Sequence, residues 1–326
     1  MRPASLFIPT AFLILLAGCG RYADFTLPAP EASGPRAPFT WEARPEAVIP
    51  RGDSSDVLNP SVVRFQGVYW NLYSEFVGHT WHTAAATSSD GIAWTKLGRI
   101  LSPQGWEGSY MAGNGSAMVV GDEILYWYEG GNPIRIALAR SRDGRIWTRH
   151  GDPVIPVGPR GSFDERAVAE PYVIRAGGNF YLFYLGQDRA RRQSLGIARS
   201  SDGVTWEKMR ANPILEPGAA GAFDENGLGE PAVWTSGGKW WMLYTGRDKG
   251  EKRRLGLAQS TDSVHWARVP NFVVSGMEKW NAEVVCDPSV EQMPDGSLRV
   301  WFGGGDVARP DQDLHGQIGV GVLRAQ

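Results

Sequence analysis

Short apolar runs alternate with turn residues along most of the chain. Residues 176–184 show the pattern, with the turn Ala176-Gly177-Gly178 followed by an aromatic run from Phe180 to Tyr184. Short apolar and aromatic runs bounded by Gly, Asp and Asn are typical of β-strands joined by tight turns. The pattern therefore predicts an all-β protein with many short strands.

One turn motif occurs four times. It reads Ser-x-Asp, then Gly or Ser, two further residues and Trp, at residues 88–94, 141–147, 200–206 and 260–266. Gly accepts a positive φ and Asp hydrogen-bonds to its own backbone, so each copy predicts a hairpin turn with a structural role. The Trp is expected to pack between neighbouring sheets.

A second motif opens a strand upstream of these hairpins. It begins at Asn59, Asn114, Glu170, Glu230 and Asp287. A repeat of roughly 57 residues suits one four-stranded propeller blade. Five openings therefore predict five blades.

The last blade has no hairpin motif or outer strand of its own. Residues 41–50 match residues 147–156 in length and in both end residues, Trp and Pro. We therefore expect residues 41–50 to supply the fourth strand of blade five, which closes the ring and removes an exposed sheet edge. The predicted fold is an all-β, five-bladed β-propeller over residues 39–326.

The N-terminus has the layout of an export signal. An apolar run from Leu6 to Ala17 is too short for a permanent membrane span. Leu16-Ala17-Gly18-Cys19 is similar to a bacterial lipobox, which predicts a signal peptide over 1–18, lipidation of Cys19 and a linker over 19–38. The predicted location is the cell envelope, outside the cytoplasm, with the outer membrane favoured in a Gram-negative cell. The alternative is an ordinary cleaved signal with a chance cysteine.

Charge and cysteine content narrow the partners. The net charge of −2 gives no electrostatic reason to expect nucleic acid, and the lipid anchor is the only membrane contact expected. Two cysteines, Cys19 and Cys286, cannot form a disulfide framework, and Cys286 is expected in the core. No ligand spacing indicates a metal, and no cofactor is predicted.

The polar residues that open the strands are predicted to ring one mouth of the central channel. Three converging carboxylates, Glu170, Glu230 and Asp287, would repel one another and raise at least one pKa, as a general acid requires near neutral pH. Glycosidic bonds are commonly cleaved by such carboxylates, so these are the predicted catalytic residues. The predicted substrate-binding residues are Asn59, Asn114, Asp56, Trp81, Arg192, Arg253 and His315, with Tyr110 and Trp280 as further candidates for stacking on a sugar.

An aromatic–polar pair precedes four of the inner strands. Its repetition favours a structural lock over contact with substrate. The pairs are Trp106-Glu107, Phe163-Asp164, Phe223-Asp224 and Trp280-Asn281, and Asp56 is a candidate for the same structural role in blade one.

The strand openings, the hairpin motif and the segment Tyr244 to Asp248 together resemble the five-bladed arabinanase, levansucrase and invertase superfamily, which includes glycoside hydrolase families 43, 32 and 130. The similarity covers residues 39–326. Resemblance to family 43 implies that Glu170 is the general acid. The other two acids of that family fall on Asn59 and Asn114, whose amides cannot act as bases. Either Glu230 and Asp287 have taken over that role, or Asp56 reaches the mouth, or the protein binds without cleaving.

Three functions remain open from the sequence. The leading one is a glycoside hydrolase acting on extracytoplasmic oligo- or polysaccharide. The second is a glycan-binding surface lipoprotein without catalysis. The third is a phosphate-dependent phosphorylase, because family 130 holds phosphate with basic side chains and residues 187–193 and 247–254 are rich in Arg and Lys. Those side chains alternatively face solvent, or recognise an acidic sugar.

Overall fold

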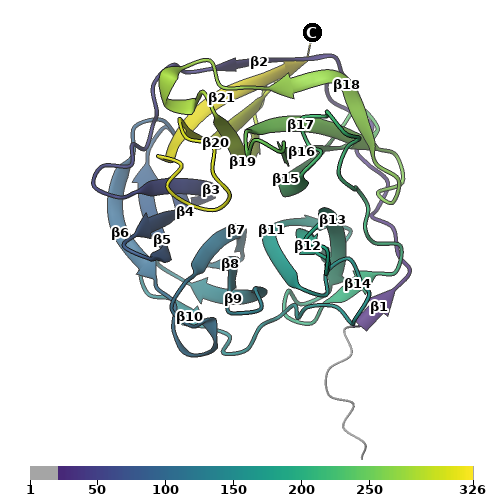
Figure 1. Cartoon of the computed structure of the whole chain (residues 1–326), viewed down its shortest axis with the longest axis horizontal. Helices are drawn as coiled ribbons and strands as arrows, with labels where there is room; N and C mark the ends of the chain where they lie inside the picture. The colour runs from purple at the N-terminus through teal and green to yellow at the C-terminus, as the bar shows by residue number, and fades with distance from the viewer. Residues whose placement is uncertain (1–20, 326) are drawn as a thin grey trace, which may run out of the picture.

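The computed structural model describes residues 21–325, whose regular structure is β-strand apart from two short 3-10 helices. The strands form antiparallel sheet units arranged around a central axis (Figure 1). This confirms the predicted all-β class. No helix in the described part of the chain is long and apolar enough to cross a membrane.

The described strands fall into five such units, which we number in chain order; one parallel bridge, Arg253 to Val284, joins units four and five into a single eight-stranded sheet. Unit one is β3 (Asp56–Phe65), β4 (Val68–Val77), β5 (Thr80–Ser88) and β6 (Thr95–Leu101). Unit two is β7 (Ala112–Val120), β8 (Glu123–Gly130), β9 (Arg135–Ser141) and β10 (Thr148–Arg149). Unit three is β11 (Ala167–Ala176), β12 (Asn179–Gln187), β13 (Gln193–Ser200) and β14 (Glu207–Met209). Unit four is β15 (Gly227–Ser236), β16 (Lys239–Arg247), β17 (Arg253–Ser260) and β18 (Ala267–Val274). Unit five is β19 (Val284–Gln292), β20 (Leu298–Gly305), β21 (Gln317–Ala325) and β2 (Phe39–Ala43).

The outer strand of unit five comes from the N-terminal part of the chain. β2 pairs antiparallel with β21, with Trp41 opposite Leu323, and a separate bridge joins Ile49 to Ile318. The pairing begins at Phe39, two residues before the predicted segment. Pro45 has no N–H to donate, so the regular ladder stops at Ala43 before contact resumes near Ile49.

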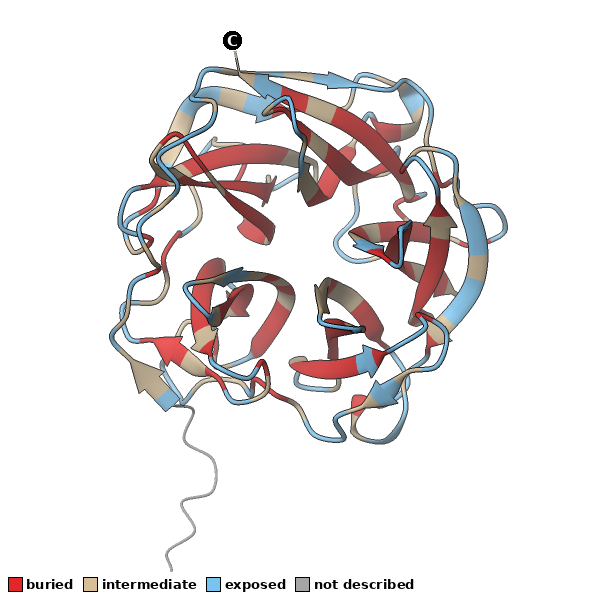
Figure 2. Ribbon diagram, turned by 180° about the vertical axis from the view of Figure 1, so that it is seen from behind, coloured by how far each residue is buried: buried red, intermediate tan, exposed pale blue. Residues whose placement is uncertain are grey.

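The hairpin turns receive side chains from neighbouring units. In unit three, Asp202 Oδ1 accepts hydrogen bonds from the N–H groups of Val204 and Thr205, both at 2.8 Å. The buried Trp127 of unit two donates its indole N–H to Gly203 O at 2.8 Å. Trp301 of unit five contacts Gly91 O of unit one in the same way. The turns are therefore structural contacts between units, which confirms the role predicted for them. Figure 2 shows the buried residues concentrated on the strands.

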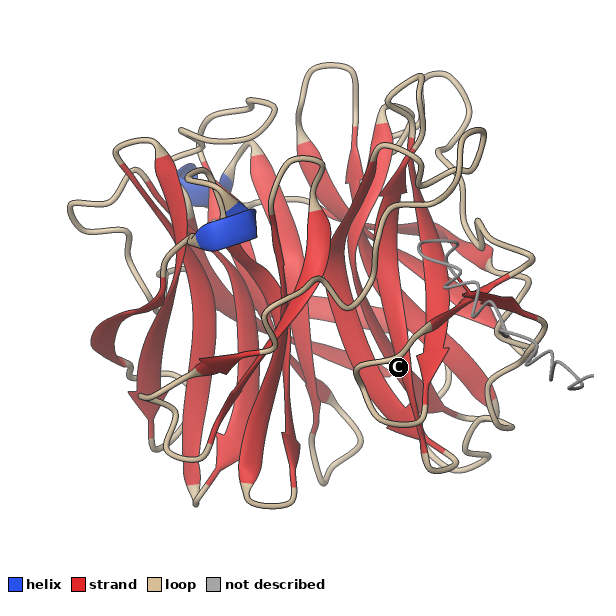
Figure 3. Ribbon diagram, turned by 90° about the horizontal axis from the view of Figure 1, so that it is seen from below, coloured by secondary structure: helices blue, strands red, loops and turns tan. Residues whose placement is uncertain are grey.

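The aromatic–polar pairs are also structural. In unit three, Asp164 is fully buried. It accepts a hydrogen bond from the Tyr184 hydroxyl (3.1 Å) and forms an ion pair with Lys208 (2.6 Å). In unit four, Asp224 has equivalent partners in Tyr244 and Arg268. Glu107 of unit two repeats the arrangement with Tyr128 and Arg149. We call these three carboxylates the lock acids. Glu107 and Asn281 lie in the two short helices, η1 (Gly105–Glu107) and η2 (Lys279–Asn281), at one end of the strands (Figure 3).

Residues 21–38, which belong to the predicted linker over 19–38, contact the sheet units. β1 (Arg21–Ala23) pairs in parallel with β14, and Leu27 is buried in the core cluster shared by units three and four. Phe25 packs against the same cluster. Two apolar residues at i and i+2 lie on one face of an extended segment, which is enough to dock it. We call residues 21–38 the strap. The predicted signal peptide and Cys19 lie outside the described residues.

Candidate active site

The five strand-opening residues share one unusual backbone conformation. Each inner strand carries a β-bulge at this point, seen as a break in register such as that between Ala169 and Tyr172. Left-handed backbone costs about 1–3 kcal/mol for a residue other than Gly, so the surrounding sheet must impose it. The φ angles are 52° at Asn59, 46° at Asn114, 51° at Glu170, 49° at Glu230 and 54° at Asp287.

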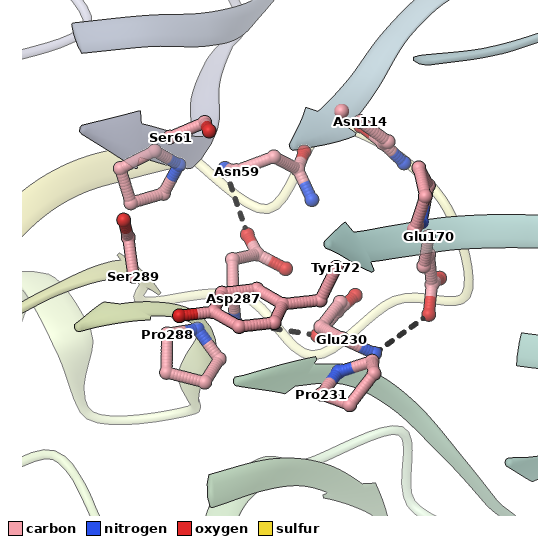
Figure 4. Close-up of a pocket in the computed structure, with 13 residues that line it drawn as sticks. Asn59, Ser61, Asn114, Glu170, Tyr172, Glu230, Pro231, Asp287, Pro288 and Ser289 are labelled. Carbon is pink, nitrogen blue, oxygen red and sulfur yellow. Dashed lines mark hydrogen bonds between the residues drawn. The ribbon is translucent and has the colours of Figure 1, made fainter. Parts of the chain in front are cut away.

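The bulges turn these side chains toward a common centre, where they form a chain of hydrogen bonds (Figure 4). The Glu230 N–H donates to Glu170 Oε2 at 2.9 Å, and the Asp287 N–H donates to Glu230 Oε2 at 3.3 Å. The Asn59 N–H donates to Asp287 Oδ2 at 2.9 Å. Each carboxylate is thus held by the backbone of the next unit. We call Glu170, Glu230 and Asp287 the ring acids, and the structure brings them together as predicted.

A fourth carboxylate, Glu129, joins this arrangement and was missed by the sequence analysis. It lies near the end of β8, buried, and accepts hydrogen bonds from Asn114 Nδ2 and from the Glu170 N–H, both at 2.8 Å. The signal was present in the repeat. Glu129 follows Tyr128 as Ser74 follows Tyr73 and Thr245 follows Tyr244, and in each case the second side chain contacts the opening residue of the next unit.

Burial and mutual repulsion raise the pKa of these acids. Burial raises the pKa of Glu129 to about 8, with further contributions from Glu230 and Asp311. Burial, and then the charges of Glu230, Glu129 and Asp287, hold the pKa of Glu170 well above its usual range. The pKa of Asp287 is raised by burial and by Glu230. Protonated carboxyl groups are therefore available here near neutral pH.

Two further groups touch the ring acids. The Cys286 thiol is buried, as predicted, and donates to Asp287 Oδ2 at 3.1 Å. Arg253 carries its charge beside this cluster and donates to the backbone oxygens of Arg309 (3.3 Å) and Pro310. Glu230, Cys286 and Asp287 each place a potential metal-ligand atom within 4.8 Å of the others. Burial raises the pKa of the Cys286 thiol well above its usual range.

A cavity of about 520 Å³ opens above the ring acids. Of the predicted site residues, it is lined by Asn59, Asn114, Glu170, Glu230, Asp287, Trp81 and Arg253. Tyr110 and Glu129 also line it, as does Arg166, which the sequence analysis did not name. A second cavity, of about 40 Å³, lies against the bulges and is lined by Ser61, Tyr172 and Ser289 among others (Figure 4).

Four predicted contacts lie elsewhere and are corrected here. Asp56 is buried and accepts hydrogen bonds from the backbone N–H groups of residues 313, 314 and 316. It therefore anchors the β20–β21 loop. Arg192 is drawn outward by an ion pair with Asp188 at 2.9 Å, and His315 is paired with Asp306 at 2.7 Å. Trp280 stacks on Phe302 and donates its indole N–H to Pro45 O at 2.7 Å.

Comparisons with known proteins agree with this geometry. The model of the glycosyl hydrolases family 32 N-terminal domain matches residues 137–294. A solved glycoside hydrolase superposes with a TM-score of 0.66 at 17% identity, covering 91% of this chain and 92% of its own. A thermostable family-43 glycoside hydrolase gives 0.64 at 17% identity, covering 82% and 88%. These solved structures share the all-β propeller fold with this chain, and the family 32 match covers a little under half of it.

Further similar proteins show how far the likeness extends. The β-1,2-mannobiose phosphorylase of Listeria innocua gives a TM-score of 0.65 at 12% identity, covering 89% of this chain and 94% of its own. Among curated proteins, the uncharacterized proteins MT1551 and Rv1502 of Mycobacterium tuberculosis are each 27% identical over 230 residues, 65% of this chain and 75% of theirs. The family match spans the units that carry all three ring acids and excludes Asn59 and Asn114.

Proposed function

We propose that this chain is a five-bladed propeller, closed by β2, that hydrolyses glycosidic bonds of oligo- or polysaccharide outside the cytoplasm. The observation that carries the proposal is the hydrogen-bonded set of ring acids on the floor of a cavity large enough for a sugar. Cleavage needs one carboxyl group that gives a proton and one carboxylate that takes one. Crowded acids in a buried site supply both states at one pH.

Glu170 is the proposed general acid. Burial and the neighbouring acids keep it protonated, so it can donate to the leaving-group oxygen. Glu230 is the proposed base, because it lines the cavity and lies close to the charge of Arg253. Asp287 hydrogen-bonds to Glu230 and positions it. Asn59 and Asn114 also line the cavity and can bind sugar hydroxyl groups through their amides.

The test is hydrolysis of a panel of aryl-glycosides and oligosaccharides, with and without phosphate, by the full chain and by Glu170→Gln. The matched control is Glu165→Gln, which removes a carboxylate of unit three that pairs with Arg189 outside the main cavity. Turnover that is lost in Glu170→Gln and kept in Glu165→Gln supports the proposal. Turnover that survives in Glu170→Gln contradicts it. Turnover only with phosphate would assign phosphorolysis.

The amides at Asn59 and Asn114 favour a second candidate, a glycan-binding protein without catalysis. Two of the five strand openings carry amides that bind hydroxyl groups but transfer no proton. Glycan binding that is equal in the wild type and Glu170→Gln, with no turnover on any substrate, would establish this second function.

We further propose that the protein is held at the outer face of a membrane by a lipid on Cys19. The lipobox-like sequence around Cys19, which follows an apolar run typical of an export signal, supports this. Metabolic labelling with a fatty-acid analogue should mark the wild type and spare Cys19→Ser. Equal labelling of the two, or label in neither, would contradict the anchor.

A further inference from the structure

The cavity above the ring acids has two chemically different sides. Residues from unit one, and from the segment between units one and two, give an apolar and aromatic side formed by Leu58, Trp81, Tyr110 and Met111. Units three and four give a side rich in guanidinium and amide groups. It consists of Arg166, Gln187, Arg191, Gln193, Arg247 and Arg253.

Basic residues of these loops that point away from the cavity are neutralised. Each forms an ion pair with a carboxylate of the same or the adjacent loop. The pairs are Arg189–Glu165 (3.7 Å), Arg192–Asp188 (2.9 Å), Lys249–Glu225 (3.1 Å), Lys252–Glu283 (3.0 Å) and Arg254–Asp248 (3.2 Å). Among the described residues, no carboxylate pairs with the cavity-lining Arg166 or Arg191. The unneutralised charge therefore lies where a ligand would lie.

The repeat explains why Arg191 has no partner. Units three and four form the same turn, in which Arg191 and Glu251 both have φ of 65° and donate their N–H groups to Asp188 O and Asp248 O at 3.0 Å. In unit four, Glu251 pairs with Arg247 at 3.2 Å. In unit three, the residue equivalent to Arg247 is Gln187, so Arg191 faces an amide where unit four has an ion pair. The substitution leaves one positive charge uncompensated.

Arg247, whose charge is balanced by Glu251, adds a partly satisfied guanidinium to the same side of the cavity. Its Nη2 donates to Gln193 Oε1 at 2.7 Å, and its Nε is buried and has no partner among the described residues. Arg253 is committed to the loop that contains Pro310, so it bounds the cavity. The guanidinium of Arg matches carboxylate and phosphate groups through paired N–H donors.

Three of the acids on the cavity floor do not cancel this positive charge. Glu129, Glu170 and Asp287 have raised pKa values, caused first by burial, so they keep protons near neutral pH. The acids also lie on the floor of the cavity, whereas Arg166 and Arg191 lie in the exposed loops of its wall. A ligand can therefore place a sugar ring over the acids and an anionic group against the arginines.

We propose that the substrate is an anionic sugar, whose carboxylate or phosphate ester binds Arg166, Arg191 and Arg247 while its ring lies toward Trp81 and Tyr110. This rests on the proposed function of the cavity as a carbohydrate site. It differs from general carbohydrate binding because it assigns a charge to the substrate and a side of the cavity to that charge.

The experiment measures binding by calorimetry to full-length Glu170→Gln, which does not consume its ligands. Two matched pairs are compared: an oligogalacturonide with its methyl ester, and glucose 6-phosphate with glucose. Inorganic phosphate is titrated separately. We expect at least one anionic sugar to bind tenfold or more tightly than its neutral counterpart, with the difference shrinking as salt rises.

The arginines are tested in the same background. Adding Arg166→Gln and Arg191→Gln together should abolish the preference for the anionic sugar, and both residues are exposed, so folding should be kept. Arg160→Gln is the matched control, because it removes an exposed charge of the same sheet unit outside the cavity. Circular dichroism checks the fold of each variant.

The proposal is overturned by equal affinity within both pairs, by no binding of either anionic sugar, or by a preference that survives the double substitution. Binding of inorganic phosphate with no preference for anionic sugars also overturns it, because the arginines would then hold a free co-substrate. The readout is binding, so it is independent of turnover. Absent hydrolysis with an intact preference would remove the proposed catalysis and leave the anionic site.

Discussion

The lock acids and the ring acids are the same type of group in opposite situations. Asp164 and Asp224 are buried, and each is met by a tyrosine hydroxyl and a cation at short distance. Glu170 and Asp287 are buried as well, but their closest charged neighbours are other carboxylates. A buried carboxylate that contacts a cation and a hydrogen-bond donor is compatible with a stable fold. Carboxylates crowded against one another lower the stability of the fold, and such groups are typical of functional sites. Within one repeat, the comparison therefore distinguishes carboxylates with a structural role from carboxylates that are candidates for catalysis.

The largest expected effect is on catalysis at the ring. Glu170→Gln should lower kcat by about 100- to 10,000-fold, because a general acid contributes that much. Its free energy of unfolding should stay about the same, since Gln is neutral like the protonated acid and its side-chain oxygen can still accept the Glu230 N–H. Rates and urea unfolding measured on the same preparation check both parts. A large loss of stability would place Glu170 with the lock acids.

The next effect is on stability at a lock. Lys208→Met leaves Asp164 buried without its cation, which should cost about 3–5 kcal/mol of unfolding free energy. The activity of the remaining folded protein should be unchanged. Urea unfolding measures the loss, and the control is the double variant Lys208→Met with Asp164→Asn. The double variant should recover part of the loss, because no charge is then left buried. A double variant as unstable as the single one would contradict the lock.

A third prediction uses the pH dependence of stability to test Glu129, the buried carboxylate that contacts the ring acid Glu170. Burial raises the pKa of Glu129 to about 8, above the value of about 4.3 for an exposed Glu. The folded state therefore binds this proton more tightly, and its contribution to stability is present below the lower pKa and lost as pH rises toward 8. Unfolding midpoints between pH 5 and 8 should fall in the wild type and fall less in Glu129→Gln. Equal slopes in the two proteins would contradict the assignment, and Glu165→Gln should behave like the wild type.

The sequence predicts the parts of this molecule that repeat. The strand openings place Glu170, Glu230 and Asp287 together because the same bulge recurs in each unit. Positions set by single loops were not predictable in this way. Asp56 and His315 are directed by one loop of unit five, whose path no repeat defines. Glu129 was missed because its role appears only when the second strands of the units are aligned with one another.

The strap shows how a departure from the repeat can carry information. Three hairpin turns have Gly at φ of 72–76°, and the fourth has Ser263 at 64°. In two of the three, a Cβ would meet Trp127 or Trp301 at 2.9 Å, whereas unit three has Phe183 where unit two has Trp127. The smaller ring admits a side chain at Ser263. That side chain accepts the Leu27 N–H at 2.8 Å and so holds the strap.

The smallest expected effect follows from this contact. Ser263→Gly relieves left-handed strain of about 1–2 kcal/mol and loses a hydrogen bond of about 1 kcal/mol, so the unfolding free energy should change by about 1 kcal/mol or less. Hydrogen exchange should nevertheless become faster at Leu27 and in β1 while staying unchanged at the ring acids. Such a result would separate the attachment of the strap from the stability of the propeller. Unchanged exchange at Leu27 would show that the apolar contacts of Phe25 and Leu27 hold the strap without Ser263.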